Sequence, residues 1–333
     1  MNNAAGRGES TSNTPRLPVL VRLPNWVGDV CMSLPVLDLL DQSGVTYVIC
    51  ARPWAQDLLA GLPSQGFIPM QGKAWQDARA IRTWRKAHLS SDVGLLLPDS
   101  LTSALSFKLA GIQSAGYQDD GRTLLLKWPF AKPNPRPHAV EHWFGLAFNT
   151  LQQWGVQPTR DKPNATLSLK LIERHWDESA ACLRQAGLVD HNFVLIAPTA
   201  TGLHHGKVKV WPHFAELTQA LLEAGHRVVM CPPPNERPAA MQNAPRAEML
   251  PALGLGSFAA LASRSSLVIC NDSGVSHLAA AMGARQLTLF GVTDPARTGP
   301  WTTQAWCMGS SQAWPSLDQV VTQSLTLLSS QAP

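Results

Sequence analysis

The sequence predicts an α/β protein built from two doubly wound parallel sheets in tandem. The first observation is that short apolar runs rich in β-branched residues alternate with segments of helical spacing. The second is that proline-rich stretches at 129–137 and 157–163 interrupt this alternation, which then resumes. Strands that alternate with helices are typical of parallel sheets covered on both faces. Because such sheets bind ligands at the carboxyl ends of their strands, two facing sheets predict a cleft between domains.

Length and composition limit the class of protein. The 333 residues are enough for two domains of ordinary size, and 45% hydrophobic with 15% charged residues indicates a globular chain. The six cysteines are scattered with no C-x-x-C pair, which favours buried thiols over a metal knuckle or a disulfide framework. No apolar run approaches the ~18 residues of a membrane span, and no signal-peptide core is recognisable, so we expect a cytoplasmic protein. A net charge of +4 suits an anionic substrate or a membrane surface and does not by itself indicate nucleic acid.

The elements are expected in the following order. Residues 1–16 are rich in Asn, Gly, Ser and Thr without apolar periodicity, which predicts a disordered tail. The first domain is expected over 17–161, with a helix at about 138–154 near its end, and the second over 162–333. The predicted strands are the apolar runs 18–23, 45–51 and 92–97 in the first domain and 193–198, 226–231, 267–270 and 286–290 in the second.

The turn after the first predicted strand carries a glycine and a carboxylate, in the run Pro24-Asn25-Trp26-Val27-Gly28-Asp29. Glycine permits a tight turn, and Asp29 falls at the start of the helical run 30–40. One interpretation is that Asp29 caps this helix. The other is that Asp29 is a general base, because the carboxyl end of a strand faces the predicted cleft.

A second turn of this kind has the sequence Asn271-Asp272-Ser273-Gly274-Val275-Ser276-His277, between strand 267–270 and the helical run 278–282. Backbone N–H groups at a helix start bind anions, and small residues let a diphosphate come close. Capping alone explains Asp272 or Ser273, but it does not explain Gly274 together with His277. The turn therefore predicts an anion site.

The loop at 199–212, after strand 193–198, is rich in groups that bind phosphate. Its hydroxyls and ammonium groups belong to Thr199, Thr201, Lys207 and Lys209. It is not a nucleotide-triphosphate loop, because Gly202 and Gly206 are too close together and Val208 stands where Ser or Thr would bind magnesium. The loop therefore predicts phosphate binding without an evident metal ligand.

Two further patterns each have a functional and a structural interpretation. His138, Glu141 and His142 match the inverted zinc-peptidase motif on one helical face, but no third ligand is recognisable. Arg79, Arg82, Arg85 and Lys86 form a basic cluster, either as a solvated helix face or as a wall of the cleft that binds a phosphorylated acceptor.

Taken together, the sequence resembles glycosyltransferase family 9, the bacterial lipopolysaccharide heptosyltransferases, and is most similar to the heptosyltransferase II branch. In the first half the matching segments are Trp26-Val27-Gly28-Asp29, Leu97-Pro98-Asp99-Ser100, Ser103-Ala104-Leu105, Ala110-Gly111-Ile112 and His138-Ala139-Val140-Glu141. In the second half they are Lys209-Val210-Trp211-Pro212, Asn271-Asp272-Ser273-Gly274 with His277, Phe290-Gly291 and Thr293-Asp294-Pro295.

The resemblance implies two facing Rossmann-like domains of the GT-B type. It also implies ADP-L-glycero-D-manno-heptose as donor and, as acceptor, the phosphorylated inner core of lipopolysaccharide on its lipid A anchor. Asp29 then matches the proposed base, Lys209 and Thr201 match donor-phosphate contacts, and Glu236 matches a carboxylate near the donor ribose. The second donor-binding segment corresponds to Asp272, Ser273, Gly274 and His277.

The expected reaction is an inverting displacement that needs neither a metal nor another cofactor. An acceptor held in the inner membrane allows peripheral contact with its cytoplasmic face, and no nucleic acid is expected as a partner. Whether Lys207 or Lys209 reaches the diphosphate stays open at this point, because the loop before them looks longer than is usual in the family. The alternative functions are a sugar-nucleotide epimerase, a noncatalytic nucleotide-sugar-binding protein and, ranked lower, a zinc peptidase.

Overall fold

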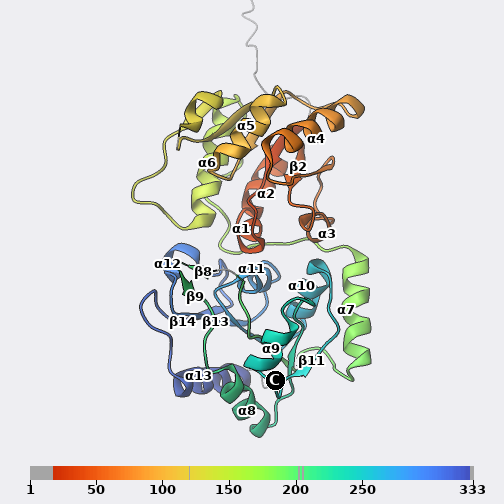
Figure 1. Cartoon of the computed structure of the whole chain (residues 1–333), viewed down its shortest axis with the longest axis vertical. Coiled ribbons are helices and arrows are strands. Elements are labelled where there is room, and N and C mark those ends of the chain that lie inside the picture. The colour runs from red at the N-terminus through yellow and green to blue at the C-terminus, as the bar shows by residue number, and fades with distance from the viewer. Residues whose placement is uncertain (1–17, 120, 202, 205, 331–333) are drawn as a thin grey trace, which may run out of the picture.

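The computed structural model describes residues 18–119, 121–201, 203–204 and 206–330, and it contains two six-stranded parallel sheets placed one above the other (Figure 1). Residues 1–16, predicted as a tail, lie outside the described residues. We call the part up to α6 the amino-terminal half, the part from α7 onward the carboxy-terminal half, and residues 154–172 between them the linker. The predicted boundary at residue 161 lies within this linker. Among the described residues no helix is both long and apolar enough to cross a membrane.

The amino-terminal half is a doubly wound sheet, as predicted. Its strand order is β3-β2-β1-β4-β5-β6, with every neighbouring pair parallel. The strands are β1 Val19–Arg22, β2 Tyr47–Ala51, β3 Phe67–Pro69, β4 Val93–Leu96, β5 Gln113–Tyr117 and β6 Trp128–Phe130. The helices are α1 Val27–Met32, α2 Leu34–Gln42, α3 Ala55–Leu58, α4 Ala74–Ala87, α5 Leu101–Leu109, the 3-10 turn η1 Arg122–Leu125 and α6 Ala139–Gln153.

The carboxy-terminal half repeats this topology, with the order β11-β10-β7-β12-β13-β14. The strands are β7 Val194–Ala197, β10 Val228–Met230, β11 Glu248–Met249, β12 Leu267–Asn271, β13 Gln286–Phe290 and β14 Ala305–Gly309, and a small antiparallel pair is formed by β8 Leu203–His204 and β9 Lys207–Val208. The helices are α7 Glu173–Gln185, α8 Phe214–Glu223, α9 Arg237–Asn243, α10 Leu255–Ser263, α11 Gly274–Ala281, α12 Pro295–Thr298 and α13 Leu317–Ser329.

The apolar core runs without a break from one half to the other. Successive residues of a strand point to opposite faces. Val19 and Val21 therefore pack on α1, α2 and α6, whereas Leu20 packs on α4 and α5. The first of these cores continues through α1 and α11 to one face of the second sheet, whose other face is covered by α8, α9 and α13. The inner faces of both sheets thus share one core.

Several elements differ from the sequence prediction. The expected single helix at 30–40 is two helices, α1 and α2, separated at Ser33. Pro35 explains the break, since it has no N–H to continue α1 and is well accommodated in the first turn of α2. The helix expected at 278–282 begins four residues earlier, at Gly274, so that Gly274 and His277 belong to α11 itself.

Candidate active site

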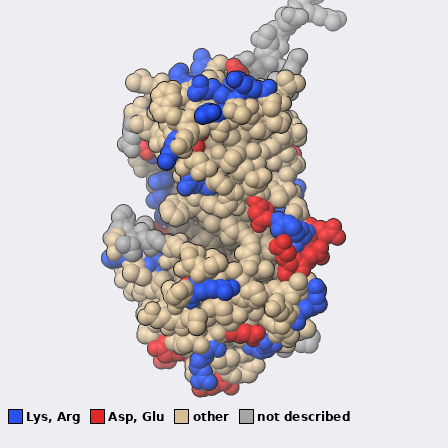
Figure 2. Space-filling view, turned by 45° about the vertical axis from the view of Figure 1, so that its right-hand side comes forward, with Lys and Arg blue, Asp and Glu red and all other residues tan. Residues whose placement is uncertain are grey.

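A cavity of about 540 Å³ lies between the two halves, and Figure 2 shows the corresponding hollow at mid-height of the molecule. This volume is within the range of sites for small molecules and cofactors. Every residue predicted for catalysis or donor binding lines it: Asp29, Thr199, Thr201, Lys209, Glu236, Asp272, Ser273, Gly274 and His277.

The strand order explains why these residues meet. In each half the chain reverses its direction of winding between two adjacent central strands, β1 and β4 in the first sheet and β7 and β12 in the second. Turns that follow such strands open onto a crevice at the carboxyl edge of the sheet. Asp29 follows β1, Thr199 follows β7 and Asp272 follows β12. Both crevices face the same cavity.

Two glycines let α1 and α11 come into contact across the cavity (Figure 1). A Cβ at position 28 would lie 2.5 Å from Cδ2 of His277, and a Cβ at position 274 would lie 3.0 Å from Cβ of Val27. Real Cβ atoms essentially never make contacts below about 3 Å, so a larger residue at position 28 would displace the buried imidazole of His277. The close approach therefore depends on Gly28 and places the start of α1 against α11.

Asp29 lies in the first turn of α1 and is not its cap. The N-cap position belongs to Trp26, and no side chain caps this helix, so the capping interpretation of Asp29 is wrong. Burial raises the pKa of Asp29 to about 6, the positive charge of Lys209 opposes the rise, and the charge of Asp272 adds to it. The side chain is thus a carboxylate at neutral pH with an affinity for protons well above that of an ordinary aspartate.

The opposite wall of the cavity offers hydrogen-bond donors. Lys209 Nζ lies 3.5 Å from Asp272 Oδ2, at the start of α11. Among the described residues, the buried Ser273 Oγ and His277 Nδ1 have no hydrogen-bond partner. Buried polar atoms are nearly always paired, so these two are placed to bind a ligand. Burial lowers the pKa of His277 to about 4, so the imidazole is neutral and can donate only one hydrogen.

Two side chains hold the loop that carries Lys209. Asn271 accepts a hydrogen bond from the backbone N–H of Trp211 at 2.8 Å, and its amide donates to the carbonyl of Thr199 at 3.4 Å. Thr199 in turn donates its hydroxyl hydrogen to the carboxylate of Glu236. The end of β12 thereby fixes the loop after β7 and the start of α9 against one another.

The sequence did not assign a role to several residues of the cavity. Trp26 is 67% exposed at its rim, and the buried hydroxyl of Thr293 has no hydrogen-bond partner among the described residues. An apolar wall is formed by Leu253, Leu255 and Phe258. Thr293 follows β13 within a few residues. Because this strand was predicted, the position of Thr293 after its carboxyl end could have identified it as a residue of the site. The apolar wall carries no such signal, because its residues look like ordinary core residues.

The predicted basic cluster lies elsewhere. Arg79, Arg82, Arg85 and Lys86 are on α4 and do not line the cavity. Arg79, Arg82 and Lys86 are exposed, while the guanidinium of Arg85 donates to the carbonyl of Ala110 at 3.2 Å. Their role toward an acceptor stays a prediction.

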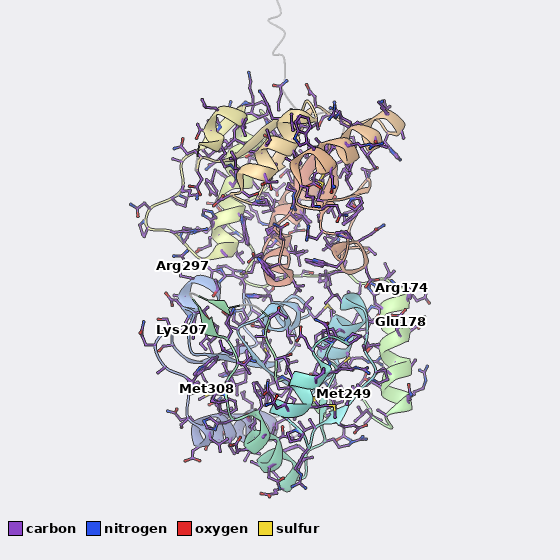
Figure 3. All side chains as sticks on the ribbon, viewed as in Figure 1. Arg174, Glu178, Lys207, Met249, Arg297 and Met308 are labelled. Carbon is purple, nitrogen blue, oxygen red and sulfur yellow. The ribbon has the colours of Figure 1, made fainter. Side chains whose placement is uncertain are left out.

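The two candidate lysines differ in their position. Lys209 lines the cavity, whereas Lys207 is an exposed residue of the short strand β9, at the surface of the carboxy-terminal half (Figure 3).

The zinc-peptidase interpretation is wrong, because its three residues do not share a face. His138 is the N-cap of α6, and its two ring nitrogens bond to the N–H of Val140 and, at 3.0 Å, to the carbonyl of Gly299. Glu141 is exposed, whereas His142 is buried and stacked on Tyr117. In the described part of the chain, no three His, Cys, Asp or Glu side chains are grouped as metal ligands.

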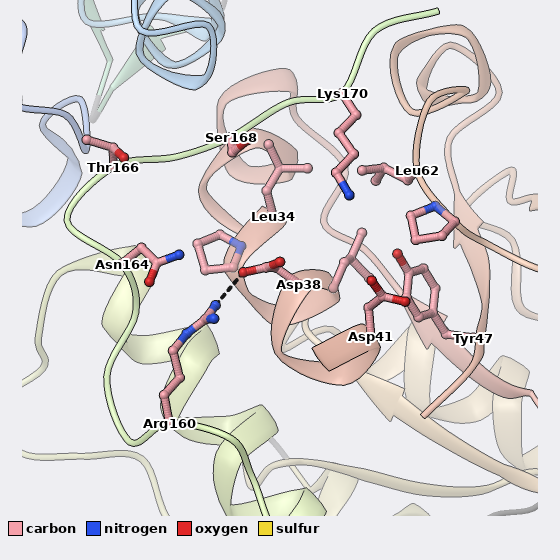
Figure 4. A pocket seen from close by; sticks show the side chains of 13 residues that line it. Leu34, Asp38, Asp41, Tyr47, Leu62, Arg160, Asn164, Thr166, Ser168 and Lys170 are labelled. Atoms are coloured by element: carbon pink, nitrogen blue, oxygen red, sulfur yellow. Dashed lines mark hydrogen bonds and ion pairs between the residues drawn. The ribbon is translucent and has the colours of Figure 1, made fainter. Parts of the chain in front are cut away.

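A second cavity, of about 50 Å³, lies between α2 and the linker and is much too small for a nucleotide (Figure 4). Arg160 of the linker pairs with Asp38 of α2 at 2.5 Å, as the dashed line in Figure 4 shows. The cavity therefore marks where the linker is tied to the amino-terminal half.

Comparison with known proteins gives consistent results. The model of glycosyltransferase family 9 (heptosyltransferase) matches residues 81–328. The chain is 26% identical to lipooligosaccharide heptosyltransferase 2 of Haemophilus influenzae over 86% of this chain and 87% of that protein. The structure of E. coli ADP-heptose lps heptosyltransferase II superposes with a TM-score of 0.75 at 24% identity, covering 95% of this chain and 99% of that one. E. coli heptosyltransferase WaaC with ADP-2-deoxy-2-fluoro heptose gives a TM-score of 0.68 at 20% identity, with 93% and 99% covered. The predicted arrangement of two facing Rossmann-like domains is thus confirmed.

Proposed function

Because the chain belongs to glycosyltransferase family 9, the heptosyltransferases, we propose that it transfers heptose from ADP-L-glycero-D-manno-heptose to the inner core of lipopolysaccharide, with inversion and without a metal. The observation that carries the proposal is one cavity in which the Asp29 carboxylate of one half confronts the anion-binding groups of the other. The relative named above, the lipooligosaccharide heptosyltransferase 2 of Haemophilus influenzae, supports the substrate class.

The donor is proposed to bind along the carboxy-terminal half. Lys209, Thr201 and the N-terminus of α11, with the free Ser273 hydroxyl, would hold the diphosphate. Glu236 would accept hydrogen bonds from the ribose, and the apolar wall of α10 would cover the base. The complex of a protein of this fold with ADP-2-deoxy-2-fluoro heptose supports the choice of ADP-heptose.

The proposed reaction is a single displacement at the anomeric carbon. The acceptor hydroxyl attacks that carbon, its proton passes to Asp29, and the bond from carbon to the phosphate oxygen breaks with its electron pair going to ADP. Lys209 and the start of α11 then stabilise the negative charge that grows on the departing diphosphate. Because this diphosphate leaves as a stable anion, one protein carboxylate is sufficient and inversion results.

The acceptor is proposed to approach from the amino-terminal half, at the cytoplasmic face of the inner membrane. The exposed side chains Arg79, Arg82 and Lys86, with Arg85 beside them, are the proposed contacts for its phosphates. A guanidinium forms two parallel hydrogen bonds with phosphate, which a lone ammonium cannot.

The direct test is mass spectrometry of the products that the purified protein forms from truncated lipopolysaccharide. ADP-heptose and a panel of other nucleotide sugars are supplied as donors, with EDTA-treated protein as one arm. Heptosylated product without added metal is the expected result. Transfer from a different nucleotide sugar would contradict the donor, and conversion of the donor without acceptor would indicate an epimerase.

The pH profile should reveal the raised pKa of Asp29. Only the ionised carboxylate can accept the acceptor proton, and burial places its pKa at about 6. We therefore expect kcat/KM to be constant on this limb above pH 7 and to fall about tenfold per unit below pH 6. Measured between pH 4.5 and 8.5, a profile that stays flat down to pH 5 would show that Asp29 is not the group that titrates.

The contact between α1 and α11 gives a second prediction. Gly28→Ala places a methyl group against the imidazole of His277, so this buried ring must shift within the wall of the cavity. We expect kcat to fall about tenfold, because small displacements of reacting groups are costly. Gly145→Ala in α6 is the matched control, since its Cβ would only meet Tyr117 Oη at 3.8 Å. Equal turnover of the two variants would contradict the assigned contact.

A further inference from the structure

A cluster of polar contacts joins the two halves beside the linker, outside the cavity. Asp57 of α3 forms an ion pair with Arg174 at the start of α7. Asp57 Oδ1 also lies 3.2 Å from Nε2 of His175, and Oδ2 accepts a hydrogen bond from the backbone N–H of Gly256 at 3.4 Å. We call these four residues the interdomain clasp. In it, one carboxylate of the amino-terminal half binds two helices of the carboxy-terminal half.

Within the carboxy-terminal half, further polar contacts hold Arg174 of the clasp in position. Arg174 also pairs with Glu178 at 2.9 Å, and Glu178 accepts a hydrogen bond from the hydroxyl of Ser257. Figure 3 shows Arg174 and Glu178 at the end of α7 nearest the amino-terminal half, and Figure 2 shows charged side chains of both signs at the edge of the hollow. Arg174 is therefore held in place toward Asp57 by its neighbour one turn along.

The side chains of Asp57 and His175 fit against the start of α10 only because Gly254 and Gly256 have no Cβ. His175 is fully buried, and a Cβ on Gly256 would collide with its imidazole. A Cβ on Gly254 would lie 3.0 Å from Asp57 Oδ2. Gly254 is the N-cap of α10 and has no side chain with which to cap it. Asp57 thus supplies, from the other half, the acceptor that an N-cap residue normally provides.

The clasp connects the elements that carry the two walls of the active site. Leu253, Leu255 and Phe258, at the start of α10, line the cavity on the donor side. Asp57 follows β2, which pairs directly with β1, and β1 leads into Asp29. The angle between the halves at the clasp therefore sets the distance between the base and the donor site.

The position beside the linker adds a mechanical argument. The ion pair between Arg160 and Asp38 ties the beginning of the linker to α2, and α7 begins directly after the linker ends. Hinges absorb their changes in a few residues between rigid elements. Arg174 and His175, in the first turn of α7, bind Asp57 directly beyond this hinge. A rotation about the linker that moved the halves apart on this side would separate Arg174 and His175 from Asp57.

The electrostatics favour an ionised clasp at neutral pH. Burial raises the pKa of Asp57, but the hydrogen bonds from Arg174, His175 and Gly256 outweigh it and hold this pKa below its usual value. The carboxylate is thus charged wherever the proposed reaction runs.

We propose that Asp57 is a positioning residue that holds the two halves in the closed arrangement through Arg174, His175 and the start of α10. The structural part of this proposal is independent of the substrate, and only its effect on turnover rests on the proposed function. Asp57 does not line the cavity, so its effect on the reaction passes through the elements that it holds, which are α7 and the start of α10.

The test compares Asp57→Ala with Asp190→Asn, which removes an exposed ion pair with Arg264 within the carboxy-terminal half alone. Spin labels are placed on the exposed native Cys307 and on an introduced Gln76→Cys, since the other five cysteines are buried. Pulsed dipolar spectroscopy on the full chain is expected to give a broader and longer distance distribution for Asp57→Ala and an unchanged one for Asp190→Asn. The backbone amide of Gly256 should also exchange at least tenfold faster in Asp57→Ala. Unchanged distances and exchange would overturn the proposal.

The kinetic arm separates positioning from general damage to the fold. Asp57→Ala is expected to lower kcat for heptosyl transfer about fivefold to tenfold while ADP affinity stays within threefold, and Asp57→Asn, which keeps an acceptor oxygen for Gly256, should lose less. Equal loss of ADP affinity and kcat would contradict a role through closure. If wild-type protein transferred no heptose, the proposed function would fail while the distance measurement still decided on the clasp.

Discussion

Asp29→Asn is expected to reduce turnover by about 10²- to 10⁴-fold, the usual contribution of a positioned general base. Asparagine keeps the shape of the side chain but cannot accept the acceptor proton. Because the change leaves Lys209 and the start of α11 intact, ADP affinity should stay within a few-fold of wild type. Steady-state kinetics at saturating acceptor, together with calorimetric titration with ADP, measures both. Turnover within about threefold of wild type would rule out Asp29 as the base.

The stability of the Asp29→Asn variant is the control for its folding. The pKa of Asp29 is about 6 in the folded protein against 3.8 as the reference value, so its ionisation opposes folding. This cost is absent below pH 3.8, where the carboxyl is protonated in both states, grows as the pH rises to 6 and is complete above it. At pH 7 Asp29→Asn should therefore raise the free energy of unfolding by about 1–3 kcal/mol, with no gain near pH 3.5. A destabilised variant would make its loss of activity uninformative about the base.

Lys209→Ala is expected to weaken ADP binding about 10- to 100-fold, since a hydrogen bond to a charged group contributes about 1.5–3 kcal/mol. The ammonium lies 3.5 Å from Asp272 Oδ2, just before α11, and Lys209 lines the cavity together with Ser273 and His277. Its loss also leaves the buried Asp272 carboxylate without its cation. Calorimetric titration with ADP in buffers of low and high ionic strength should show a smaller salt dependence in the variant.

Lys207→Ala is the matched control for this measurement. It removes the same charge two residues away, from an exposed side chain on β9 that does not line the cavity. ADP affinity should change less than twofold. The reverse order of effects would move the phosphate contact to Lys207 and would mean that the loop rearranges when the nucleotide binds.

The sequence predicted the central strands because their residues are apolar and β-branched. This composition is found in inner strands that are buried on both faces, namely β1, β2, β7, β12 and β13. Two of the strands that it missed, β5 and β6, lack this signal. β5 has the sequence QSAGY, and β6 has the sequence WPF, in which Pro129 is tolerated because the strand is at the sheet edge. Position in the sheet, rather than propensity, makes these segments extended.

The candidate site was predictable to the extent that it depends on strand ends. Turns after parallel strands open at the carboxyl edge of their sheet, which groups Thr199 with Asp272 at the edge of the second sheet and places Asp29 at the same edge of the first. The contact of Gly28 with His277 and the reach of Asp57 to α10 join residues about 250 and 200 positions apart, and no local pattern encodes them. The position of α4 outside the lining of the cavity could not be predicted for the same reason. Helical spacing shows which face of a helix is polar, but it does not show what that face contacts.

The apolar core that passes through α1 and α11 limits how this enzyme can be recombined with its relatives. Chimeras that join the amino-terminal half of one protein to the carboxy-terminal half of another cut this core in two, even when the junction lies in the linker. Val27 and Gly28 would have to match the residues at Gly274 and His277, so a workable exchange carries α1 together with the carboxy-terminal half. Substitutions on the α11 side of this contact during the divergence of such proteins would accordingly require compensating substitutions in α1.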